Sequence, residues 1–73
     1  MSGRGRAQQT RFAVGPLRLV TYRQERGYGI IDSRTGRPAY TESHPVSGRP
    51  IVALVPDVHR ALLIAQSILE AEE

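Results

Sequence analysis

The segment LRLVTYRQERGYGIIDSRTGRPAYTE, residues 17–42, carries the clearest strand and turn pattern in the chain. Over residues 17–23 the side chains alternate with a period of two, which is typical of a strand with one buried face. Asp32 and Gly36 mark a turn, because aspartate can bond its own backbone and glycine tolerates a positive φ. The pattern predicts an antiparallel meander of three strands. The strands are expected at 17–23, 28–32 and 37–42.

The meander is followed by a loop and a helix. Residues 43–50 contain two prolines and a glycine, which favours a loop. The apolar run 51–55 is either a fourth strand or a buried extended linker. Pro56-Asp57 signals a helix start, and a helix is expected at about 56–72. Its apolar stripe would consist of Val58, Ala61, Leu62, Ala65, Ile68 and Leu69.

We therefore predict an α+β fold, in which an antiparallel three- to four-stranded β-meander is covered on one face by a C-terminal α-helix. Residues 12–73 would form a single small domain, with 12–14 as a short strand extension before a bend at Gly15-Pro16. Residues 1–11 contain no bulky apolar side chain after Met1, so we expect a disordered, flexible basic tail.

Composition narrows the class of protein. The 73 residues include no cysteine, which excludes disulfides and thiolate zinc sites. Residues 1–37 hold eight arginines against two acids, whereas residues 38–73 hold two arginines against five acids. A basic half of this kind is typical of proteins that bind polyanions or acidic surfaces. No apolar run approaches a membrane-spanning length, so we expect a soluble, cytoplasmic protein.

Catalysis and metal binding are not expected. Two acid–histidine pairs occur, Glu42 with His44 and Asp57 with His59, but no histidine lies four residues from another. A domain of this size has little room for an oxyanion hole and a substrate cleft. We predict a protein that is not an enzyme and carries no metal or cofactor.

The candidate binding residues lie on the meander. Each predicted strand carries one tyrosine, and arginines flank all three, so a sheet face rich in both is expected. The residues are Tyr22, Tyr28, Tyr40, Arg18, Arg23, Arg26, Arg34 and Arg37.

Part of this stretch resembles a known family. Residues 20–32, which contain Arg26-Gly-Tyr-Gly-Ile-Ile31, resemble the cold-shock domain segment that stacks single-stranded bases on aromatic rings. The resemblance covers about 13 residues and implies that Tyr22 and Tyr28 are stacking rings and that Arg26 contacts phosphate. The family has tryptophan where this chain has Thr21 and phenylalanine where it has Ile30, and its last third forms barrel strands instead of a helix.

Two functions follow from these residues. The first is non-enzymatic binding of nucleic acid, DNA or RNA, through the arginine- and tyrosine-rich sheet face. The alternative is a regulatory protein of the phage or plasmid type that modulates a larger host protein machine through its basic surface. A second interface, for a protein partner or a homodimer, is predicted from residues outside the meander. These residues are Leu63, His59, Arg4 and Arg6.

Overall fold

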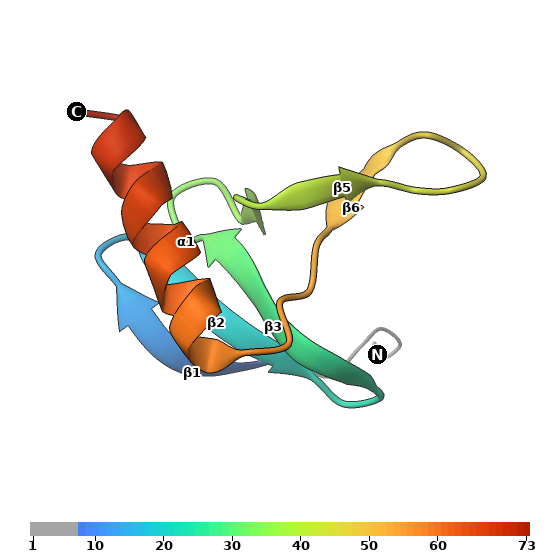
Figure 1. Cartoon of the computed structure of the whole chain (residues 1–73), viewed down its shortest axis with the longest axis horizontal. Helices are drawn as coiled ribbons and strands as arrows, with labels where there is room; N and C mark the ends of the chain where they lie inside the picture. The colour runs from blue at the N-terminus through green and yellow to red at the C-terminus, as the bar shows by residue number, and fades with distance from the viewer. Residues whose placement is uncertain (1–7) are drawn as a thin grey trace.

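The computed structural model describes residues 8–73 and shows an α+β fold with two antiparallel sheets (Figure 1). The larger sheet has the strand order β1-β2-β3-β4, and the smaller pairs β5 with β6. The larger sheet comprises β1 (Gln8–Val14), β2 (Leu17–Tyr22), β3 (Glu25–Asp32) and β4 (Arg37–Pro38). The remaining elements are β5 (Thr41–Ser43), β6 (Pro50–Val52) and helix α1 (Val58–Ala71). The predicted fold class is confirmed.

Strand β1 is longer than the sequence indicated. It pairs with β2 from Gln8 opposite Tyr22 to Val14 opposite Leu17, so Gly15-Pro16 is a two-residue hairpin turn. Gly15 has φ +58°, a left-handed conformation that glycine adopts without strain. Residues 8–11, which we assigned to the flexible tail, are therefore part of the sheet. The rest of that tail, residues 1–7, lies outside the described residues.

The outer edge of β3 is shared by two segments. β4 pairs with its C-terminal end. Near its N-terminal end the backbone N–H of Tyr28 donates to the carbonyl of Val55 at 2.8 Å, and the Val55 N–H donates to the Tyr28 carbonyl at 2.9 Å. The predicted third strand, 37–42, is divided: its start is β4, which pairs with β3, and its end belongs to β5. The apolar run 51–55 is divided in the same way, because its start belongs to β6 whereas Val55 pairs with Tyr28 of β3. This hairpin projects from the body of the protein (Figure 1).

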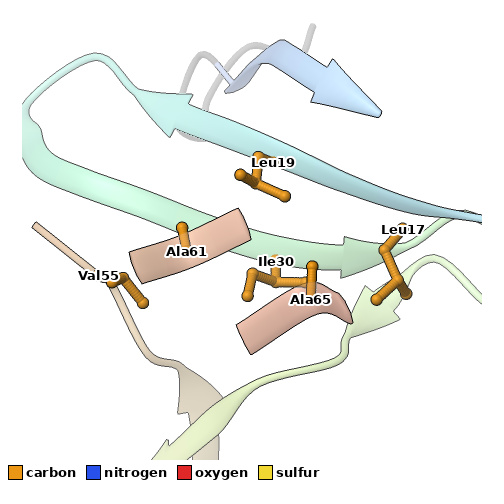
Figure 2. Close-up of a cluster of buried hydrophobic side chains, with 6 residues drawn as sticks. All are labelled: Leu17, Leu19, Ile30, Val55, Ala61 and Ala65. Carbon is orange, nitrogen blue, oxygen red and sulfur yellow. The ribbon is translucent and has the colours of Figure 1, made fainter. Parts of the chain in front are cut away.

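Helix α1 covers one face of the larger sheet. The Asp57 side chain caps its N-terminus by accepting a hydrogen bond from the His59 N–H at 3.0 Å. Ala61 and Ala65 are fully buried, and their small side chains let the helix approach the sheet closely. They pack on side chains from β2, β3 and the segment before the helix (Figure 2). The core cluster consists of Leu17, Leu19, Ile30, Val55, Ala61 and Ala65.

The opposite face of the sheet is also closely packed at one point. Leu19 and Ile30 face α1, and side chains alternate along a strand, so Val20 faces the opposite side of the sheet. A side chain at Gly29, the register partner of Val20, would face the same way. A methyl group at Gly29 would lie 2.9 Å from Cγ2 of Val52 and 3.2 Å from Cε2 of Tyr22. Space therefore favours glycine here, because an added Cβ would force the Val52 side chain of β6 or the Tyr22 ring to move.

Candidate nucleic-acid interface

The five predicted arginines of the meander occupy separate parts of the sheet. Arg23 and Arg26 lie at the β2–β3 turn, whereas Arg34 and Arg37 lie beyond the other end of β3. An eight-residue strand spans roughly 24 Å at about 3.4 Å per residue. Arg18 lies near this second end, opposite Ile31 in register, but on the face away from α1. These five guanidinium groups do not share one site.

Arg34 is engaged within the chain. Its Nη2 lies 2.9 Å from Oδ2 of Asp32 and 3.1 Å from Oε2 of Glu72, near the C-terminal end of α1. Hydrogen bonding to this guanidinium lowers the pKa of Asp32, and the two carboxylates raise the pKa of Arg34. Arg34 therefore links the β3–β4 turn to the C-terminal end of α1. Its charge is already paired with two carboxylates, so it is a poor contact for a polyanion.

The three predicted tyrosines also separate. Tyr28 packs against the core on the α1 side of the sheet. Tyr22 lies on the other side, where its ring is close to Gly29. Tyr40 is 38% exposed and lines a groove beside α1. The expectation of a single aromatic face, and with it the cold-shock arrangement of two neighbouring stacking rings, does not match this geometry.

Two predicted residues do come together, with partners that the sequence did not indicate. Arg23 and Tyr22 line an open hollow at the end of the sheet where β1 begins and β2 ends. The Arg11 Nε donates a hydrogen bond to Oγ1 of Thr21 at 3.0 Å, which holds this guanidinium beside the hollow. None of the lining residues is acidic within the described part of the chain. We call this the basic hollow, formed by Gln8, Gln9, Arg11, Thr21, Tyr22 and Arg23.

The basic hollow was missed because half of it comes from residues assigned to the tail. Gln8, Gln9 and Arg11 carry no hydrophobic periodicity, so their place in a strand follows only from pairing with β2. The signal that could have predicted this strand was Gly15-Pro16, because two such residues between strand-like segments are typical of a hairpin turn. A hairpin turn here would pair the residues before Gly15 with those after Pro16, in register back to Gln8.

One side chain of each acid–histidine pair has a local structural role. His44 Nδ1 accepts the backbone N–H groups of Val46 and Ser47 at 3.1 and 3.2 Å, which shapes the tip of the β5–β6 hairpin. Asp57 caps α1 as described above. Across residues 8–73 no group of three or more histidine, cysteine or acidic side chains could hold a metal ion.

The predicted second interface is only partly placed. Leu63 is 63% exposed and lines the groove beside α1, together with Tyr40 and Arg60. His59 is exposed in the first turn of α1 and is not among the groove residues. Arg4 and Arg6 lie outside the described residues. No helix among residues 8–73 has the length and apolar character that a membrane span requires.

Comparisons of the chain with protein-family models, with curated proteins and with solved structures found no match.

Proposed function

We propose that this protein binds nucleic acid without catalysing a reaction, and that the basic hollow is where the phosphate backbone is held. The observation that carries the proposal is the convergence of two guanidinium groups, two side-chain amides, a hydroxyl group and an aromatic ring around one hollow. These are the groups that most often contact phosphate and sugar in complexes with nucleic acids.

Each lining residue has a role that its chemistry supports. Arg11 and Arg23 contact phosphate oxygens, for which a planar guanidinium is well suited. Gln8 and Gln9 donate amide hydrogens to neighbouring phosphate or sugar oxygens. Tyr22 packs its ring against a sugar or base. Because most of these contacts go to the backbone, affinity would depend little on nucleotide sequence.

Charge near the hollow supports the same proposal. Arg26 is exposed three residues beyond Arg23 and adds positive potential without belonging to the lining. Glu25 is an exposed carboxylate opposite Tyr22 in register and opposes an incoming phosphate. Replacing Glu25 with glutamine should therefore strengthen binding.

Fluorescence anisotropy with labelled single- and double-stranded oligonucleotides, at two or more salt concentrations, tests the proposal. Arg11→Ala and Arg23→Ala should each weaken binding similarly across sequences. Each should also reduce the slope of log affinity against log salt by about 0.7 for single strands or about 0.9 for duplexes. Arg49→Ala is the matched control, because it removes the same charge from an exposed arginine of the β5–β6 hairpin that does not line the hollow.

The proposal fails if the unaltered protein binds neither kind of oligonucleotide at about 50 mM salt. It also fails if Arg49→Ala weakens binding as much as Arg11→Ala does, because contact would then be diffuse. Equal or tighter binding of polyglutamate would instead favour an acidic protein surface, the partner of the phage- or plasmid-type regulator.

A further inference from the structure

The groove beside α1 holds two of the four large hydrophobic side chains that are exposed among the described residues. Leu63 projects from the helix with 63% of its surface exposed, and Tyr40, from the segment between β4 and β5, also lines the groove. Ile64 and Ile68 line the floor, so the groove continues toward the core. Small domains bury a limited share of their surface, and further burial by association is a common source of stability for them.

The charges on this side of the helix are self-complementary. Arg60, Leu63, Ser67 and Glu70 follow each other at spacings of three, four and three residues, which places them in one stripe along α1. The midpoint of this stripe along the helix axis lies level with Ala65, which is itself buried on the opposite side of the helix. Arg60 and Glu70 lie five residues to either side, about 7.5 Å along the axis, and Leu63 and Ser67 lie two residues to either side, about 3 Å.

Both charges are placed against the dipole of their own helix. α1 has no acidic residue in its first turn and no basic residue in its last turn. Because α1 runs from Val58 to Ala71, Arg60 lies near the positive, N-terminal end of the helix dipole and Glu70 near the negative, C-terminal end. A second α1 packed antiparallel on the exposed stripe, with its midpoint at the same level, would bring each of them beside an opposite charge and an opposite helix end.

We infer that the exposed face of α1 that carries this stripe, together with the groove beside it, is a homodimer interface, in which the α1 helices of two copies pack antiparallel. Leu63 of each copy sits over the small Ser67 of the other, and Arg60 of each copy pairs with Glu70 of the other. This inference does not depend on the proposed function, because the basic hollow contains no residue of α1. A single helix pair is a small interface, so the dimer should be reversible and dependent on concentration.

Sedimentation equilibrium over a concentration series up to about 1 mM tests the inference. The unaltered protein should shift from monomer toward dimer, and Leu63→Glu should remain monomeric. Arg60→Glu and Glu70→Arg should each weaken dimerisation about tenfold, because two attractive pairs become repulsive in each dimer. All three positions are exposed, so the fold should be retained, as far-UV circular dichroism can verify.

The decisive measurement is a mixture of the two single charge reversals. One variant carries two glutamates in the stripe and the other carries two arginines, so an equimolar mixture should form heterodimers more tightly than either variant forms homodimers. The double variant Arg60→Glu with Glu70→Arg should recover dimerisation. Arg49→Glu serves as control and should dimerise like the unaltered protein.

The inference is overturned if the unaltered protein is monomeric throughout the series. Dimerisation of Leu63→Glu with unchanged affinity would also overturn it, as would a mixture that associates no better than its components.

Discussion

Gly29→Ala is the substitution whose effect follows most directly from the structure. Gly29 is the one glycine among residues 8–73 without a positive φ, so alanine meets no backbone penalty there. Its methyl group would instead lie 2.9 Å from Val52 Cγ2, whereas carbon atoms in favourable contact are about 3.5–4.0 Å apart. Overpacking of this kind costs about 1–3 kcal/mol.

That loss is large for a protein of this size. At roughly 0.05–0.15 kcal/mol per residue, 73 residues give a free energy of unfolding of about 4–11 kcal/mol. Urea denaturation followed by far-UV circular dichroism should therefore show a midpoint lower by about 2 M for a loss of 2 kcal/mol, if the slope is about 1 kcal/mol per molar urea.

A second substitution tests the assigned cause. Val52→Ala removes the obstructing methyl group, so Gly29→Ala should cost at least about 1 kcal/mol less in that background than alone. The matched control is Gly36→Ala, which has φ +76° and no atom within 4 Å of its added methyl group. Its cost, about 1–2 kcal/mol of backbone strain, should be the same with and without Val52→Ala. Strict additivity of Gly29→Ala with Val52→Ala would refute the reasoning, as would a stable Gly29→Ala variant.

Two further predictions concern stability. Asp57→Ala removes the N-cap of α1 and should lower the free energy of unfolding by about 1 kcal/mol, measured by urea denaturation at neutral pH. Because Arg34 lowers the pKa of Asp32 in the folded state, the pair contributes stability that is fully present above the ordinary aspartate pKa of about 3.9 and is lost as the pH falls through the lowered value. Asp32→Asn should therefore be less stable than the unaltered protein at pH 7, and the difference should shrink in acid; a difference that does not change with pH would contradict the assignment.

The meander, the helix and its cap were predictable because each rests on a local pattern. The period of two holds over the first three residues of β2, where Leu17 and Leu19 are buried and Arg18 is exposed, but Val20 is buried as well. The helical stripe of 56–72 contains Ala61 and Ala65, which reach the core. The capping role of Asp57 follows from its type and its position next to Pro56. Such signals depend on neighbours a few residues away.

What could not be predicted depends on contacts between distant segments. The residues of β1 before Phe12 become a strand because β2 provides its edge, and their own composition gave no indication. The divided edge of β3 depends on Val55 reaching Tyr28. The candidate site shows the same limit, because a count of arginines cannot reveal that Arg34 is held by Glu72, or that Arg11 lies beside Arg23.

The β5–β6 hairpin joins the rest of the protein at two residues that are hydrogen-bonded to each other. The chain leaves the body at Tyr40 and returns at Ala53, and the Ala53 N–H donates to the Tyr40 carbonyl at 3.0 Å, so the two ends of this excursion are fastened together. Its tip carries Val46, which is 88% exposed. Residues inserted at the tip would lengthen the hairpin loop without changing the hydrogen bond between Tyr40 and Ala53 at its base. The tip is therefore a suitable place for an inserted tag or dye that leaves both the sheet and the helix intact.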